Sequence, residues 1–321
     1  MLSAYLWFDS MMLPVDRSSS ETVSIEIESG MSGREIAELL EKEGLVRSSE
    51  LLYYVMRFKQ IDHLKAGYYS LSPADSPYYI LDILSRGIED TFQVTFPEGF
   101  IYKEVINRLA ALEKPQFDRE KLEAAFNKFA AEVDFEDNPH LADVIVEPAE
   151  GLIVPDTYKF PMSFDEEQLA GELLETFEEE RLPLLKEKAA ESEFTAYQLL
   201  IISSLIEEEG KLEEENEIIA SVIYNRLEAG QSLQLDATVQ YVLPERKERL
   251  LYADLEFESP YNTYQVNELP PSPIANPGQK AVEAALNPAD TDYLFYFARE
   301  DGSHIFTKTY QEHLQRQNEA Y

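Results

Sequence analysis

The stretch TAYQLLIISSLIEEEG, from Thr195 to Gly210, is the most sharply bounded helix that the sequence predicts. Thr195 is followed three residues later by Gln198, as in a capping box, where each side chain bonds the other residue's backbone N–H. Gly210 suits the position just beyond a helix C-terminus. Between these ends, apolar residues recur at helical spacing. We therefore predict one helix of about fourteen residues, whose apolar side chains must pack against other elements.

Three consecutive glutamates end this helix, and helical geometry separates them. With a rotation of about 100° per residue, Glu209 falls in the middle of the apolar stripe, whereas Glu207 and Glu208 fall off its centre. A carboxyl on the apolar side loses hydration, which disfavours its ionised form and raises its pKa toward the range of a general acid. The alternative is a solvated helix end in which all three side chains reach water. Spacing alone fixes no partner carboxylate and does not decide between the two.

Around this helix the sequence alternates between short strands and helices. TVSIEIESG, from Thr22, has the two-residue period of a strand and leads through Gly30 into the helical pattern REIAELLEKEG. LKAGYYSLSP followed by YYILDILSRG repeats this order, and so does TFQVTFPEG followed by FIYKEVINRLAAL. We therefore predict an α+β protein with an N-terminal segment over 1–21, a small module over 22–90, a second small α+β unit with a helical connection over 91–146, and a helix-rich domain over 147–321.

Composition excludes several classes of function. The 321 residues include 62 acidic and 27 basic side chains, which give a formal charge of -35. Because nucleic-acid binding requires clustered Lys and Arg, we expect no nucleic-acid partner. The chain has no cysteine, and its four histidines lack the short spacing of a metal-binding pair. The sequence also has no phosphate-binding loop and no dinucleotide fingerprint, so we expect neither a metal nor a cofactor.

The N-terminal stretch MLSAYLWFDSMMLPVDRSSS consists of two short apolar pieces separated by Asp9. A membrane-spanning helix needs about 20 apolar residues, so the stretch is too short to span a bilayer as written. It also lacks the basic region and the cleavage site of a signal peptide. We expect residues 1–21 to be either a local packing segment or the outer end of a membrane anchor whose start lies upstream.

A series of short motifs follows along the chain. They are KAGYYSL (65–71), VTFPEG (94–99), EGLIVPDTY (150–158), SSLIEEEG (203–210), IASVIYNRL (219–227), SLQLDATVQY (232–241), SPYNTY (259–264), LPPSPIANPG (269–278) and a His-x-Phe at His304. In this order they resemble the MltG-like (YceG-like) family of endolytic murein transglycosylases. Ala237 stands where the family usually has proline, Val242 where it has glycine, and Asn267-Glu268 where a glycine commonly precedes Leu-Pro-Pro. We expect these departures to lie in loops.

The resemblance implies both a fold and a reaction. The fold would be a small LysM-like module over 22–90 and a mixed, helix-rich YceG-like catalytic domain over 147–321. The reaction would be cleavage of the MurNAc–GlcNAc bond in nascent peptidoglycan strands by a single glutamate, leaving 1,6-anhydroMurNAc ends and using no cofactor. The family is anchored by one N-terminal helix at the outer face of the cytoplasmic membrane. Glycan strands would be the substrate, and peptidoglycan synthases are expected partners.

The resemblance also implies which residues form the site. The family's Glu-Lys-Glu motif maps the catalytic glutamate onto Glu209 or Glu207. We choose Glu209, which directly precedes Gly210 and lies centrally on the helical wheel, and keep Glu207 as the reserve, whose structural alternative is to cap a helix or pair with Arg226. Since amides bind hydroxyl and N-acetyl groups and aromatic rings stack on sugars, we expect substrate contacts, with structural roles as the alternative, from Glu150, Asn225, Gln234, Thr238, Tyr241, Tyr261, Asn262 and Tyr264.

Two other functions stay open at this point. The LysM-like module and the acidic surface also fit a non-catalytic glycan-binding or scaffold protein of the cell-wall synthesis machinery. A hydrolase of the lysozyme type would cleave the same polymer but add one water molecule to its product. The mass of the product separates the transglycosylase from the hydrolase, and a binding protein would release no product.

Overall fold

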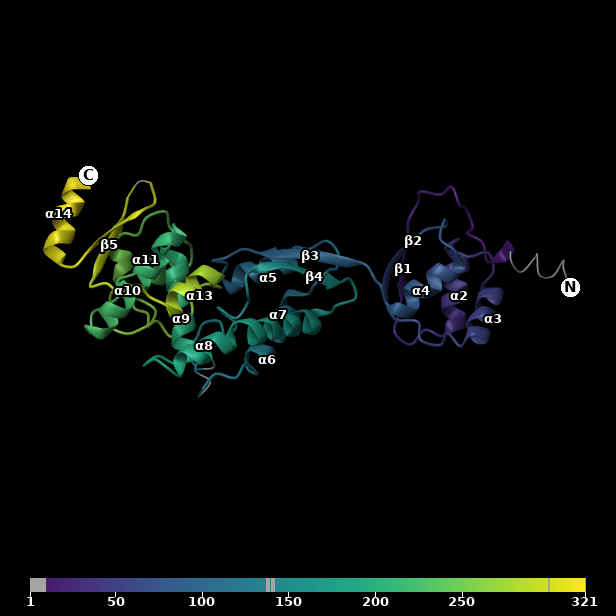
Figure 1. Ribbon diagram of the computed structural model, residues 1–321, viewed down its shortest axis with the longest axis horizontal. Helices are drawn as coiled ribbons and strands as arrows, with labels where there is room; N and C mark the ends of the chain where they lie inside the picture. The colour runs from purple at the N-terminus through teal and green to yellow at the C-terminus, as the bar shows by residue number, and fades with distance from the viewer. Residues whose placement is uncertain (1–9, 137–138, 140–141, 300, 321) are drawn as a thin grey trace. The chain divides into compact units, whose positions relative to one another are not determined.

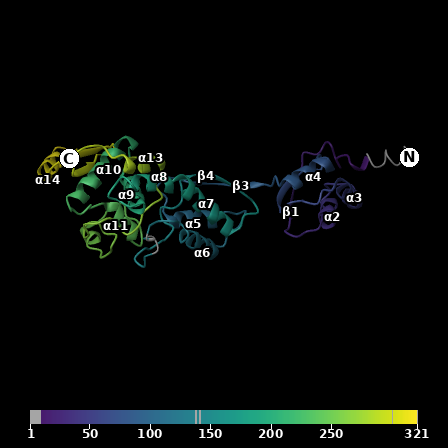
Figure 2. The ribbon, with the colours of Figure 1, turned by 60° about the horizontal axis from the view of Figure 1, so that its bottom comes forward.

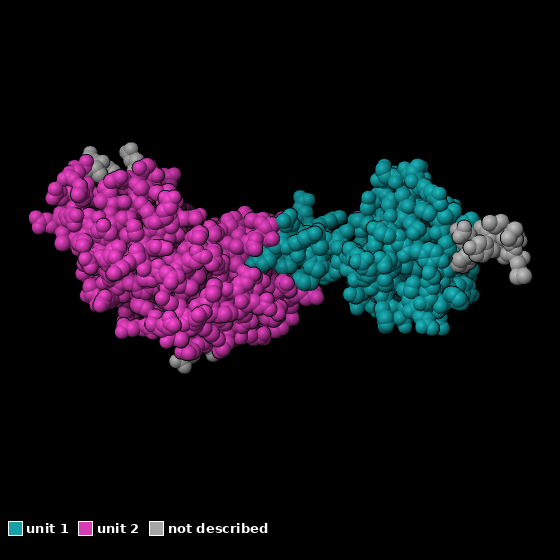
Figure 3. All heavy atoms as spheres, viewed as in Figure 1, with its two compact units in different colours: residues 1–93, 113–115, 158–165 teal, residues 94–112, 116–157, 166–321 magenta. Residues whose placement is uncertain are grey.

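The computed structural model describes residues 10–136, 139, 142–299 and 301–320, and combines helices with two-stranded sheets (Figure 1). This mixed, helix-rich architecture confirms the predicted α+β class. Contacts divide the chain into two compact units, one of residues 1–93, 113–115 and 158–165, the other of residues 94–112, 116–157 and 166–321 (Figure 3). Residues 1–9 of the predicted N-terminal segment lie outside the described part of the chain.

The first unit forms around one antiparallel pair of strands. Strand β1 (Val23–Ile27) pairs with β2 (Gly67–Leu71), with Val23 opposite Leu71. Helices α2 (Gly33–Lys42) and α3 (Ser49–Lys59) lie between them in sequence, and α4 (Pro77–Arg86) follows. Alternate strand residues and the apolar helix faces share one core, which includes Ile25, Ile27, Ile36, Leu40, Leu52, Tyr69, Leu71, Ile80 and Leu84. Helix α3 is an addition to the predicted order, and the LysM-like character of this module stays a prediction.

A strand pair and three helices come next in the chain. Strands β3 (Thr91–Phe96) and β4 (Asp156–Pro161) pair with each other, and the boundary between the two units runs through both. Helices α5 (Tyr102–Ala110), α6 (Arg119–Ala130) and α7 (Glu166–Glu180) pack together, with α6 along α7. Residues on both sides of position 146 belong to one compact unit. The predicted boundary between the second α+β unit and the helix-rich domain at this position stays a prediction.

Helix α9 (Ala196–Glu209) lies at the centre of the remaining helices. It packs against α8 (Leu182–Ala189), α10 (Asn216–Glu228), α11 (Asp236–Val242) and α13 (Gln279–Leu286), as both ribbon views show (Figures 1 and 2). The short elements η2 (Glu213–Glu215) and α12 (Tyr252–Leu255) complete this group. A terminal hairpin of β5 (Phe295–Ala298) and β6 (His304–Thr307) is followed by α14 (Tyr310–Ala320), which contacts both strands.

Two expectations from the sequence, on the departures from the family pattern and on a membrane-spanning helix, can be compared with the structure. Ala237 and Val242 are residues of α11, so the expectation that they lie in loops is wrong, whereas Asn267 and Glu268 lie in a loop as expected. The segment Asp236–Val242 instead forms about two helical turns. Over the described residues, no helix combines the length and the apolar character that crossing a bilayer requires.

Candidate active site

Helix α9 begins as its sequence predicts. The hydroxyl of Thr195 accepts a hydrogen bond from the N–H of Gln198, and the Gln198 side chain accepts one from the N–H of Thr195, which confirms the capping box. The helix ends at Glu209, and Gly210 follows with a φ of -80°, outside the left-handed region. Every side chain from 199 to 206 is buried. Because α9 is enclosed on all sides, a helical wheel separates its faces less well than expected.

The three glutamates at the end of α9 differ in their partners. The side chain of Glu208 accepts a hydrogen bond from Arg246 at 2.8 Å. Glu207 accepts one at 2.9 Å from the N–H of Gly278, the residue that caps the start of α13. Glu209 accepts one at 3.0 Å from the hydroxyl of Tyr296. The helix is intact to Glu209, the three side chains are only partly exposed, and burial raises the pKa of all three carboxyls, so the helix end is neither frayed nor fully solvated. Of the two structural roles considered for Glu207, it fills that of a helix cap.

Glu209 lies on the wall of a cavity of about 950 Å³. The wall is built from the end of α9, the second half of α10, the segment 230–236, the β5–β6 hairpin and α14. Its polar and aromatic lining includes Glu209, Arg226, Gln234, Asp236, Tyr264, Asn267, Phe295, Tyr296, His304, Tyr310 and His313. A space of this size can hold a substrate of several sugar or amino-acid residues. Within the described ranges, no three His, Asp or Glu side chains are grouped as metal ligands would be.

The surroundings of Glu209 favour the protonated form of its carboxyl. Burial raises the pKa of Glu209 to about 7, the hydrogen bond from Tyr296 opposes this shift, and the negative charge of Asp236 adds to it. A hydrogen bond from the N–H of Ala237 also favours the ionised form, and a proline at this position would have no N–H to donate. A carboxyl with a pKa near 7 can donate a proton in one step and accept one in the next.

Replacing Tyr296 with Phe should raise the pKa of Glu209 further. The substitution removes the hydroxyl that stabilises the ionised carboxyl and keeps the ring, and a hydrogen bond to a charged group contributes about 1.5–3 kcal/mol, equivalent to about 1–2 pKa units. A carbon NMR titration of the Glu209 carboxyl measures this shift. Tyr310→Phe, which also removes a hydroxyl from the cavity lining, is the control. An unchanged or lower pKa in Tyr296→Phe would contradict the hydrogen bond.

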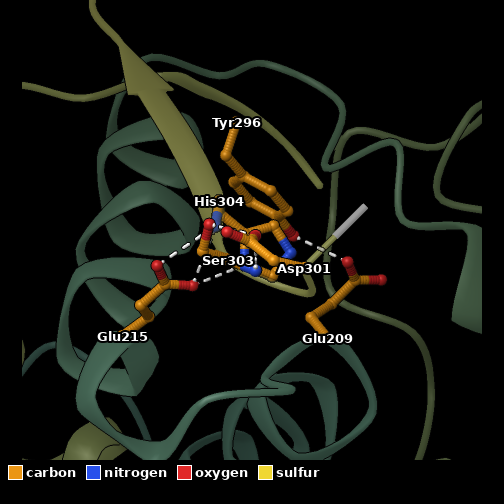
Figure 4. Close-up of polar contacts among 6 residues, drawn as sticks. All are labelled: Glu209, Glu215, Tyr296, Asp301, Ser303 and His304. Carbon is orange, nitrogen blue, oxygen red and sulfur yellow. Dashed lines mark hydrogen bonds and ion pairs between the residues drawn. The ribbon is translucent and has the colours of Figure 1, made fainter. Parts of the chain in front are cut away.

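The hairpin that carries Tyr296 is held against η2 by a half-buried pair, Glu215 and His304 (Figure 4). Glu215 accepts hydrogen bonds from the backbone N–H of His304 at 3.1 Å and lies 2.7 Å from its Nδ1. The His304 side chain is 4% exposed, and its ring meets the Tyr296 ring edge to face at a centroid distance of 5.4 Å. In the hairpin loop, Asp301 accepts hydrogen bonds from the N–H and the hydroxyl of Ser303. These contacts hold the Tyr296 hydroxyl in position toward Glu209.

A second carboxyl, that of Asp236, lines the same cavity. The hydroxyl of Tyr264 donates to its Oδ1 at 2.6 Å. Arg226, the guanidinium in the cavity wall, donates instead to the carbonyls of Ser232 and Leu294. The sequence spacing assigned no partner carboxylate to Glu209, and the first residue of α11 supplies a second carboxyl in the same cavity.

Two of the predicted substrate-binding residues, Gln234 and Tyr264, line the cavity with Glu209. Gln234 has a positive φ of 55°, and its N–H donates to the carbonyl of Thr263. Its side-chain oxygen accepts a hydrogen bond from Arg226 at 3.1 Å. The backbone turn at Gln234 therefore directs the following residues, including Asp236, along the cavity wall.

The other six predicted residues form contacts beyond the described cavity lining. Glu150 is 2% exposed and accepts hydrogen bonds from the N–H of Tyr102 and the hydroxyl of Tyr241. The remaining contacts are Tyr261 with Ser272, Asn225 with the carbonyls of Thr291 and Tyr293, Thr238 with Thr263, and Asn262 with the carbonyls of Leu255 and Phe257. Each of these contacts positions a loop or a core element, and a substrate-binding role for these six stays a prediction.

Several residues of the cavity were absent from the predicted site. They are Arg226, Asp236, Tyr296, His304 and His313. Asp236 lies inside the motif SLQLDATVQY and His304 in the His-x-Phe motif, so both could have been selected as site residues from the sequence. Tyr296 was hidden in the apolar run YLFYFA, where no pattern distinguishes a residue facing the cavity from one facing the core.

Comparison with known proteins agrees with this fold. The model of the YceG-like family matches residues 25–319. A protein of Bacillus subtilis (strain 168) named endolytic murein transglycosylase is 34% identical over 320 residues, which cover 97% of this chain and 88% of that protein. A protein of the same name from Streptococcus pneumoniae (strain ATCC BAA-255 / R6) is 28% identical, and the match covers 96% of this chain and 60% of that relative. The crystal structure of a yceG-like protein from Listeria monocytogenes has a TM-score of 0.64 and 31% sequence identity, covering 93% of this chain and 100% of that one.

Proposed function

Because the chain belongs to the YceG-like family, we propose that it is a peptidoglycan lytic transglycosylase that cuts inside glycan strands. Glu209 acts as its single general acid and base. The observation that carries this proposal is one carboxyl, with a pKa raised to about 7, on the wall of a cavity of about 950 Å³. Two relatives are named for this activity. Glu207, which accepts a hydrogen bond at the start of α13, is the weaker candidate.

The proposed reaction needs one carboxyl that works twice. Protonated Glu209 donates its proton to the glycosidic oxygen as the bond from MurNAc C1 to that oxygen breaks. The resulting carboxylate takes the proton of the MurNAc C6 hydroxyl, and the C6 oxygen forms a bond with C1. The products are a GlcNAc hydroxyl end and a 1,6-anhydroMurNAc end, and no water is consumed. Glu209 returns to its protonated form, so the cycle is closed.

The proposed substrate also indicates a location. Peptidoglycan strands are found in the bacterial cell envelope, so the enzyme would act there. The finer expectations are a position at the outer face of the cytoplasmic membrane, an N-terminal anchor and a peptidoglycan synthase as partner. They rest on the family resemblance and are part of the proposal.

The mass of the released fragments tests this function. Purified peptidoglycan incubated with the protein should release fragments with anhydro ends, each one water molecule lighter than a hydrolysis product. Fragments that carry the added water would identify a lysozyme-type hydrolase. This outcome is worth testing because many glycoside hydrolases use two carboxyls, and the cavity is lined by two, Glu209 and Asp236. Binding to glycan strands without any new ends, even at high protein concentration, would instead favour the glycan-binding or scaffold function.

A further inference from the structure

Glu209 and Asp236 are the two carboxyls in the lining of the cavity. Asp236 is the first residue of α11, and the N–H of the next residue, Ala237, donates to the carboxyl of Glu209. Asp236 is therefore the direct neighbour in the chain of a residue that contacts Glu209. Both side chains belong to the lining of one cavity, and the charge of Asp236 acts on the Glu209 carboxyl, so we expect a sugar bound against Glu209 to lie within the field of Asp236.

Asp236 is held in place by a neutral donor. The Tyr264 hydroxyl donates to its Oδ1 at 2.6 Å, and burial raises the pKa of Tyr264, so that the phenol keeps its proton. Arg226 directs its guanidinium to backbone carbonyls and to Gln234, and His304 is paired with Glu215. The carboxylate of Asp236 is thus oriented by a hydroxyl while these cationic or basic groups of the cavity wall are engaged elsewhere.

A negative charge in this place affects the proposed reaction at two points. Beside Glu209 it favours the protonated form that the first step requires. When the glycosidic bond breaks, positive charge develops at C1 and the ring oxygen of the sugar, and a fixed carboxylate nearby stabilises it. Neither effect requires Asp236 to form a bond with the sugar or to exchange a proton.

We propose that Asp236, oriented by Tyr264, is a second acidic residue of the catalytic centre, and that its charge stabilises the cationic transition state of glycan cleavage. This inference rests on the proposed function, in which Glu209 alone transfers protons. The groups that act on the Glu209 carboxyl include Tyr296 from β5, Asp236 and the Ala237 N–H from α11, Glu208 from α9 itself, and the neutral phenol of Tyr264. Asp236 is the group among these that adds a charge from outside α9.

The test compares four variants with wild type across pH 5 to 9, using the release of anhydro-ended fragments as the rate. Asp236→Asn should lower kcat by about a hundredfold while KM changes by about threefold or less. Because the charge beside Glu209 is gone, the basic limb of the pH profile should move to lower pH. Asp236→Glu should recover part of the rate, and Tyr264→Phe should lose about tenfold. Glu228→Gln, which removes an exposed charge at the end of α10, is the matched control and should match wild type.

Wild-type rate and an unmoved basic limb in folded Asp236→Asn would overturn the inference. A thermal melt of each variant shows whether it is folded. If Asp236→Asn does not fold, then Asp236→Glu and Tyr264→Phe decide, and the inference fails if both keep the wild-type rate. A wild-type protein that releases no anhydro ends would instead contradict the proposed function, so the two failures are distinguishable.

Discussion

Replacing Glu209 with Gln should reduce the release of anhydro-ended fragments by about a thousandfold or more, because a positioned general acid–base contributes about 10²–10⁴-fold and Glu209 is proposed to serve in both steps. Gln has the same size and can still accept the hydrogen bond that the Tyr296 hydroxyl donates to Glu209. The cavity should therefore keep its shape. The assay is the rate of fragment release from purified peptidoglycan, with Glu228→Gln as the control for loss of a carboxylate.

The same substitution should also stabilise the protein at alkaline pH. The folded-state pKa of Glu209 is raised from 4.5 to about 7, so the folded protein keeps a proton that the unfolded chain releases. The contribution of Glu209 to the free energy of unfolding therefore falls as the pH rises from about 4.5 to about 7, and an amide, which does not titrate, makes no such contribution. At pH 8 we expect Glu209→Gln to be more stable by about 2–3 kcal/mol, and at pH 4 to be nearly equal.

Chemical denaturation at pH 4 and pH 8 measures this difference. A variant that is inactive and less stable at both pH values would show that Glu209 supports the fold, and its loss of activity would then carry no weight for catalysis. An active, folded Glu209→Gln would contradict the proposed role directly.

Replacing Glu150 with Ala should lower the free energy of unfolding by about 2–4 kcal/mol. Its carboxyl is buried and accepts hydrogen bonds from the N–H of Tyr102 at 3.0 Å and from the hydroxyl of Tyr241 at 3.1 Å. Alanine would leave both donors without this acceptor and would open a small cavity. The measurement is urea denaturation at pH 6, where Glu150 is protonated because burial raises its pKa to about 8.

Glu150→Gln is the matched variant, since it keeps an acceptor of nearly the same shape. It should lose less than about 1 kcal/mol at pH 6. As the pH rises from about 4.5 to about 8, the wild type loses stability that the amide variant retains, so Glu150→Gln should gain on the wild type over this window. An alanine variant as stable as the wild type would contradict the structural role, and a folded Glu150→Gln with greatly reduced activity would support the substrate-binding role predicted from the sequence.

The parts of the fold that the sequence predicts well are those set by neighbours along the chain. The capping box of Thr195 and Gln198 and the end of α9 before Gly210 depend on contacts over three or four residues, and the strand alternation before Gly30 is equally local. The wheel gave Glu209 a central position on an apolar stripe. It could not foresee that α9 is enclosed on all sides, so that the distinction among the three glutamates comes from their partners Gly278, Arg246 and Tyr296.

The parts that the sequence could not predict depend on distant segments. The cavity joins Glu209 to Asp236 and to Tyr296, which is 87 residues further along the chain than Glu209. Tyrosines and amides were chosen for their suitability to bind sugars, yet Tyr261 and Asn262 are themselves buried and hydrogen-bonded within the fold. The same residue types serve sugar recognition and loop anchoring, and only the three-dimensional surroundings separate the two uses.

The most direct test of the central claim is to digest purified peptidoglycan in heavy-oxygen water with the wild type, Glu209→Gln and Glu207→Gln, and to weigh the fragments by mass spectrometry. We predict that the wild type and Glu207→Gln release anhydro-ended fragments free of heavy oxygen, whereas Glu209→Gln releases almost none. Heavy oxygen in the wild-type fragments, or full release by Glu209→Gln, would contradict a transglycosylase that works through Glu209.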